Sequence, residues 1–114
     1  MVVKLNRTAL TNARKRVKEG QVVRDQRDDW SEHAPTAAEE NKFIEDHGWG
    51  AYSAWHLGVD TEKPADTKAR YSFPFGDFTK VHRCAVISLE SRAAQNDHED
   101  ITASTKNLLK LIDS

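Results

Sequence analysis

The residues with the most chemical potential lie in the middle of the chain, between Ala54 and Arg83. This segment holds two of the five histidines and three of the four phenylalanines. If residues 55–60 form a strand, side-chain alternation places His56 and Asp60 on one face, where a histidine base and an orienting carboxylate could act together. No Ser or Cys nucleophile motif accompanies them. The plainer interpretation is a hydrogen-bonded histidine at the edge of the core and an aspartate that begins a turn.

A second polar group follows Asp77, where we expect a helix to begin. His82 and Arg83 would lie in its first turns, and helix N-termini attract anions through their unpaired amides and the helix dipole. The plainer interpretation is a simple cap by Asp77 on a solvated helix face. The candidate ligand site therefore consists of polar side chains of the central segment: His56, Asp60, Lys68, Arg70, His82 and Arg83. Such a site would take a small anionic or nucleotide-like molecule.

The sequence contains no recognisable metal or cofactor motif. The five histidines are not spaced as HxH or HxxxH, and Cys84 follows His82 by two positions without a second cysteine. Neither a Walker-type loop nor a dinucleotide-binding glycine pattern occurs. We therefore predict no cofactor, no metal site and no catalytic residues, and we interpret Cys84 as an inert buried thiol.

Charge is divided sharply along the N-terminal part of the chain, although the net charge is only -1. Residues 1–20 carry a net charge of +5, and residues 21–47 carry -5. A basic arm is typical of nucleic-acid binding. Its candidate contacts are cations of the first helix: Arg14, Lys15, Arg16 and Lys18. The alternative is that the two segments neutralise each other, within one chain or between subunits. Because the whole chain has no cationic excess, the sequence favours this alternative and argues against a nucleic-acid partner.

Local signals predict the elements of the N-terminal half. Residues 6–19 read as a helix that is capped by Asn6 and ended by Gly20. Thr36 and Glu39 form a capping box before a helix over residues 37–47.

The C-terminal half is expected to hold two strands and two helices. Residues 55–60 and 70–75 predict strands, and the second strand alternates aromatic and small residues. Asp77 would cap a helix over residues 78–95, and Asp100 would cap the last helix, whose apolar residues follow helical spacing.

These elements predict an α+β fold in a single domain over residues 1–114. Residues 1–20 hold the basic N-terminal helix, and residues 21–114 form the main body. We expect a mostly helical domain with a small two- or three-stranded sheet packed on a C-terminal helical hairpin.

The cysteine content and the apolar runs of the sequence predict the cellular compartment. One cysteine allows no intramolecular disulfide, and no apolar run approaches the roughly 20 residues of a membrane span. The first residues lack the apolar region of a secretory signal. We expect a cytoplasmic protein without a membrane partner.

Two motifs, WHLGVD and KARYSFPFGDFTKVHR, carry a resemblance to known proteins. Together with RDDWSEHAP, SRAAQ and LLKLID, they resemble a family of small uncharacterised bacterial proteins, from about Val22 to Asp113. The second half is also similar to a module joined to phage head-maturation and structural proteins. That match covers Tyr71 to Asp77, where Ser72 departs from the usual Lys. Neither resemblance implies catalytic residues.

Three hypotheses for function follow. The leading hypothesis is a non-enzymatic binding or scaffold module that associates with itself as a homo-oligomer. The first alternative is a binding protein or enzyme for a small anionic ligand, which would use the central polar cluster. The second alternative is nucleic-acid binding through the basic helix.

Overall fold

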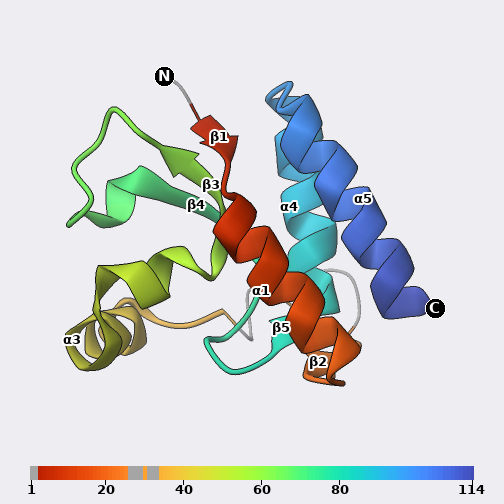
Figure 1. Cartoon of the computed structure of the whole chain (residues 1–114), viewed down its shortest axis with the longest axis horizontal. Helices are drawn as coiled ribbons and strands as arrows, with labels where there is room; N and C mark the ends of the chain where they lie inside the picture. The colour runs from red at the N-terminus through yellow and green to blue at the C-terminus, as the bar shows by residue number, and fades with distance from the viewer. Residues whose placement is uncertain (1–2, 26–29, 31–33) are drawn as a thin grey trace.

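The computed structural model describes residues 3–25, 30 and 34–114 of the chain, and Figure 1 shows how their helices and strands are arranged. The elements in chain order are β1 (Val3–Leu5), α1 (Arg7–Lys18), β2 (Val22–Val23), α3 (Ala37–Ser53), β3 (His56–Asp60), β4 (Tyr71–Pro74), β5 (Val81–His82), α4 (Arg83–Gln95) and α5 (Glu99–Asp113). A 3-10 turn, η1 (Lys68–Arg70), leads into β4.

The larger sheet is antiparallel and has three strands in the order β1-β3-β4. Gly58 lies in the central strand, opposite Leu5 on one side and Ser72 on the other. A Cβ at position 58 would stand 2.6 Å from Ser72 Oγ and 2.7 Å from Phe73 Cδ2. The close approach of these side chains therefore requires glycine at this point.

A helical hairpin of α4 and α5 packs beside this sheet, and α1 lies next to α5 (Figure 1). The largest fully buried side chains include Leu57 from the sheet, Phe75 after it, and Ile101, Leu108 and Ile112 from α5. The predicted α+β fold, with a small sheet packed on a C-terminal helical hairpin, is confirmed.

Several local predictions for the helices are confirmed. The Asn6 side chain caps α1, and Gly20 takes the left-handed conformation with φ of 79° after its end. Thr36 and Glu39 make both hydrogen bonds of the capping box of α3. Gly48 has φ of 86° and ψ of 173°, so it breaks the helical backbone, but α3 resumes and runs to Ser53. No helix in the described ranges is long and apolar enough to cross a membrane.

The prediction of a helix over residues 78–95 is wrong in its first turn, because α4 begins only at Arg83. The Asp77 carboxylate caps a turn instead, where its Oδ1 accepts the backbone N–H of Thr79 at 3.0 Å and of Lys80 at 2.8 Å. Phe78 adopts a φ of 70°, which is incompatible with a helix. The chain then forms β5, which pairs in parallel with β2.

Tertiary contacts explain why the helix starts late. The Phe78 ring stacks on Phe43 of α3 with 4.3 Å between ring centroids. Phe78 therefore packs against α3 and not on the apolar face of the helix predicted over residues 78–95. The cap of α5 also differs from its prediction. His98 occupies the N-cap position, and the Asp100 side chain accepts the N–H of the following residue, Ile101.

Candidate functional site

Three side chains form an ionic cluster that we call the His82 clasp: Asp25, Asp77 and His82. The side chains of Asp25 and His82 are buried, and that of Asp77 is 34% exposed. His82 Nδ1 lies 2.7 Å from Asp25 Oδ2, and His82 Nε2 lies 2.7 Å from Asp77 Oδ2. The His82 side chain is only 5% exposed. Because a neutral imidazole has a single N–H, both carboxylates receive a hydrogen bond only when the ring is protonated. Burial alone would lower the pKa of His82, but the hydrogen bonds and charges of Asp77 and Asp25 raise it above its ordinary value.

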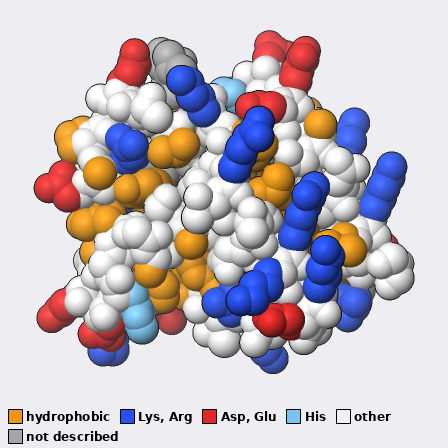
Figure 2. All heavy atoms as spheres, viewed as in Figure 1, with side chains coloured by type: hydrophobic (Ala, Val, Ile, Leu, Met, Phe, Trp, Pro, Cys, Tyr) orange, Lys and Arg blue, Asp and Glu red, His pale blue; other side chains and the backbone are white. Residues whose placement is uncertain are grey.

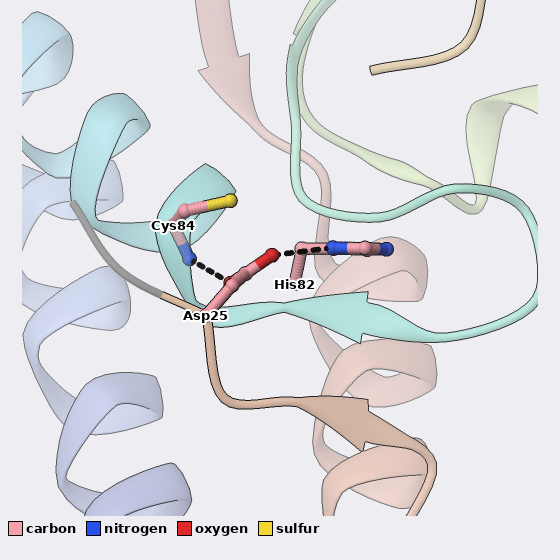
Figure 3. Close-up of side chains that lie close together, drawn as sticks. All are labelled: Asp25, His82 and Cys84. Carbon is pink, nitrogen blue, oxygen red and sulfur yellow. Dashed lines mark hydrogen bonds and ion pairs between the residues drawn. The ribbon is translucent and has the colours of Figure 1, made fainter. Parts of the chain in front are cut away.

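Asp25 also caps α4 from a distant part of the chain. Its Oδ1 accepts the backbone N–H of Cys84 at 2.8 Å, whereas His82, the N-cap residue itself, makes no side-chain cap bond (Figure 3). Burial acts to raise the pKa of Asp25, but hydrogen bonds from the thiol and N–H of Cys84, and from His82, bring it below its ordinary value. A carboxylate at this place satisfies an unpaired amide and complements the helix dipole.

Asp77 is held on the other side of the ring. Burial acts to raise its pKa, but the hydrogen bonds from His82 and from the N–H groups of Lys80 and Thr79 lower it. Both carboxylates of the clasp are therefore ionised near neutral pH, and they flank an imidazolium.

Cys84 brings a sulfur atom to the same place. One carboxylate oxygen of Asp25, one ring nitrogen of His82 and the Cys84 Sγ all lie within 4.8 Å of one another. Figure 3 shows that the residues come from three places: Asp25 follows β2, His82 ends β5, and Cys84 lies in the first turn of α4. Asp25 precedes His82 by 57 residues, so it could not be predicted as a partner of His82 from the sequence. The parallel pairing of Val23 with His82 joins them, and no local pattern signals it.

His56 belongs to a different network. Its Nδ1 lies 2.8 Å from the carbonyl oxygen of Tyr52, and the ring is 3% exposed. The Tyr52 hydroxyl donates to Glu40 Oε2 at 3.1 Å, and the Lys68 Nζ lies 3.3 Å from Glu40 Oε1. Burial lowers the pKa of His56, although the Tyr52 carbonyl and the Glu40 charge oppose this effect. The pKa of Tyr52 is raised, mainly by burial and also by Glu40, so its hydroxyl stays protonated.

The other residues of the predicted ligand site each have a nearby protein partner. Asp60 Oδ1 accepts the N–H of Glu62 at 3.0 Å, as in the turn that the plainer interpretation expects. The Arg70 guanidinium donates to the Lys63 carbonyl at 2.7 Å. Arg83 makes a bidentate pair with Asp113, at 2.8 and 3.1 Å.

The structure brings His56 and Lys68 together through Tyr52 and Glu40, but places His82 in the separate clasp. Among the described residues, the hydrogen bonds and ion pairs of His56, Tyr52 and Glu40 form one network, and those of His82 form another. The amide of Cys84 at the N-terminus of α4, where the sequence suggests an anion, is already bound by the Asp25 carboxylate.

Of the four predicted nucleic-acid contacts, Arg16 has a structural role. Its guanidinium lies over the Trp55 ring, 4.6 Å from the ring centroid. Its Nε donates to Asn12 Oδ1 at 3.1 Å, and a terminal nitrogen donates to the Thr79 carbonyl at 3.0 Å. Arg16 therefore fixes α1 to the body of the protein.

The remaining cations of α1 form an exposed surface, the basic face, which consists of Arg7, Arg14, Lys15 and Lys18. The opposite side of the helix is buried through Ala9, Ala13 and Val17. Figure 2 shows Lys and Arg side chains gathered over the half of the molecule that carries α1 and α5, while much of the hydrophobic surface lies toward the other half. Across residues 3–25, 30 and 34–114, no ion pair joins α1 to the acidic residues of positions 21–47.

Comparison of the chain with protein-family models, with curated proteins and with solved structures finds no match.

Proposed function

We propose that the chain is a non-enzymatic binding module that docks on the phosphate backbone of a nucleic acid through the basic face of α1. The observation that supports this proposal is that the four cations are exposed and, among the described residues, lack an ion-pair partner. The sequence favoured neutralisation of residues 1–20 by residues 21–47. Within the described part of one chain, the ion pairs of that interpretation are missing.

The spacing of the basic face suits a linear array of phosphates. Arg7, Arg14 and Lys18 lie in one row of the helix, with Thr11 between the first two, and Lys15 lies beside them. At 1.5 Å of rise per residue, the row spans about 16 Å. Its C-terminal part borders an open hollow of about 400 Å³ that is lined by Thr11, Arg14, Lys15, Lys18 and Glu19. Arginine and hydroxyl side chains are typical phosphate contacts that carry no sequence information.

The buried histidines support a binding role over catalysis. His56 and His82 are 3% and 4% exposed, and each has protein hydrogen-bond partners. Their interactions stabilise the fold, whereas the basic face takes no part in the core.

Fluorescence anisotropy with a labelled DNA duplex, measured over a series of salt concentrations, tests the proposal. If all four cations meet phosphates, the logarithm of the binding constant should fall with the logarithm of salt concentration at a slope of about -3 to -4. The double variant Arg14→Gln/Lys18→Gln should bind more weakly and reduce the slope by about 2. The matched control, Lys42→Gln/Lys63→Gln, makes the same change in net charge on α3 and on the loop after β3. No binding of the wild type at low salt, or equal weakening in both double variants, would overturn the proposal.

Self-association is the competing use of the same face. Sedimentation of the wild type and of Arg14→Gln/Lys18→Gln at low and high salt separates the two. A wild-type oligomer that dissociates in the variant, together with no DNA binding, would assign the basic face to a second copy of the chain.

A further inference from the structure

We propose that Asp25, His82 and Cys84 form a binding site for a zinc-class transition-metal ion, and that Asp77 orients His82 within it. The three residues offer a carboxylate oxygen, an imidazole nitrogen and a sulfur, all within 4.8 Å of one another. A tetrahedral zinc ion with bonds of about 2.0–2.3 Å holds its ligand atoms about 3.3–3.8 Å apart. To close around an ion, His82 Nδ1 and Asp25 Oδ2, now 2.7 Å apart, would separate by about 0.6 Å. The Cys84 sulfur would approach them by no more than about 1.5 Å, so both changes are side-chain adjustments.

The orientation of His82 fits a metal ligand. Zinc-bound histidines commonly donate their second ring N–H to a carboxylate, which fixes the ring and its tautomer. Asp77 lies 2.7 Å from His82 Nε2 and is itself held by the N–H groups of Thr79 and Lys80. With Nε2–H donated to Asp77, Nδ1 faces Asp25 and is available to a metal once its proton leaves.

Asp25 can bind the ion without giving up its role in the fold. Its Oδ1 caps α4 through the Cys84 N–H, while its Oδ2 faces His82 Nδ1. A metal would take the place of the proton between Oδ2 and Nδ1, so the cap of the helix remains.

Charge balance also favours the exchange. Without metal, two carboxylates and one imidazolium leave one net negative charge in the cluster. Binding of a divalent ion releases one proton from His82 Nδ1 and one from the Cys84 thiol, because the ligands must be deprotonated. The two positive charges of the metal ion replace the positive charges of the two released protons. The net charge of the cluster is unchanged, so no additional charge has to be buried.

The donor set selects the class of metal. Hard ions such as Mg²⁺ and Ca²⁺ prefer oxygen ligands alone, whereas mixed nitrogen, oxygen and sulfur donors suit Zn²⁺ and Co²⁺. Three protein ligands also leave a fourth position for water. The histidine spacing and the lack of a second cysteine argue against a zinc site in the sequence, but the third ligand comes from the segment after β2.

Cobalt provides the direct test. The full chain, stripped with a chelator and kept reduced, is titrated with Co²⁺ while its absorption spectrum is recorded. We expect one ion per chain, the visible bands of tetrahedral cobalt and a thiolate-to-cobalt charge-transfer band in the near ultraviolet, all lost when Zn²⁺ is added. Cys84→Ser should remove the charge-transfer band. Asp77→Asn should keep the band but weaken binding by about 10–100-fold. The matched control, His47→Gln, alters an exposed histidine and should change nothing.

Proton release supplies a second readout that needs no variant. In weakly buffered solution near neutral pH, Zn²⁺ binding to the wild type should release protons, because the Cys84 thiol must lose its proton to become a ligand. The proposal is overturned if the wild type shows no thiolate band at saturating cobalt. It is also overturned if the band survives in Cys84→Ser, or if zinc releases no protons.

Discussion

Replacement of Asp25 by alanine should be the most informative single change in this protein. The substitution removes the acceptor of the hydrogen bonds from His82 Nδ1 at 2.7 Å, from the Cys84 N–H at 2.8 Å and from the Cys84 thiol. It leaves a ring that is 5% exposed with one carboxylate instead of two, and it uncaps α4.

The magnitude follows from the burial of the pair. Both partners are almost fully enclosed, with side-chain exposures of 5% for His82 and 7% for Asp25. Removal of one partner of a buried ion pair costs about 3–5 kcal/mol of the free energy of unfolding. Loss of a helix cap accounts for about 1 kcal/mol of that total. Since a domain of this size has about 5–15 kcal/mol of stability, the variant should still fold but unfold at much lower urea concentration.

Urea denaturation followed by tryptophan fluorescence measures the loss, with a chelator present so that no metal contributes. Asp25→Asn separates the two effects, because asparagine is a good cap but carries no charge. The free energy of unfolding of Asp25→Asn should lie between those of the wild type and Asp25→Ala. Asp46→Ala is the control, since it removes an exposed pair with Lys42 on α3 and should leave the unfolding midpoint unchanged. A loss of less than about 1 kcal/mol in Asp25→Ala would refute the assignment of the clasp as a buried ion pair.

Three further changes test other parts of the structure. A Cβ in Gly76→Ala would overlap the backbone carbonyl oxygen of Lys80, so urea denaturation should show a loss of about 1–3 kcal/mol; wild-type stability would contradict the tight turn. Burial holds the pKa of His56 below its ordinary value of 6.5, so the unfolded state takes up the proton first as the pH falls. The His56 contribution to stability is therefore constant above about pH 6.5 and decreases below it until the folded-state pKa is passed. The raised pKa of His82 acts in the opposite sense, so the measurement is the difference in thermal stability between the wild type and His56→Gln over pH 5–8. The extra pH dependence of the wild type should be missing in His56→Gln and unchanged in the exposed-histidine control His47→Gln. Leu108→Ala empties a fully buried position of α5 and should cost about 2–5 kcal/mol in urea denaturation; a near-neutral effect would place the core elsewhere.

Local contacts explain which elements could be predicted. The capping box of Thr36 and Glu39 and the stop at Gly20 depend on residues within one turn of each other, so the sequence displays them directly. The apolar spacing of residues 101–112 likewise predicts the buried face of α5. The strand β1 escaped prediction because three residues are too few to show a period.

The candidate sites depended much more on tertiary structure. The sequence singled out His82 but paired it with Arg83 and an anion, whereas in the structure His82 lies between two carboxylates and Arg83 pairs with Asp113. The basic residues of α1 were also found from sequence. Only the structure separates Arg16, which packs on Trp55, from the exposed basic face. No local pattern in the sequence predicts the position of Trp55 beside α1.

The sequence by itself determined the composition of the fold: which segments are helices, where most of them start and stop, and the unequal distribution of charge along the chain. These properties arise from interactions between residues that are close in sequence. The tertiary structure alone decided that α4 begins at Arg83 and that Asp25 meets His82 and Cys84. The physical reason is that the parallel pairing of β2 with β5 joins residues 57 positions apart, and only the packing of the whole core sets that pairing.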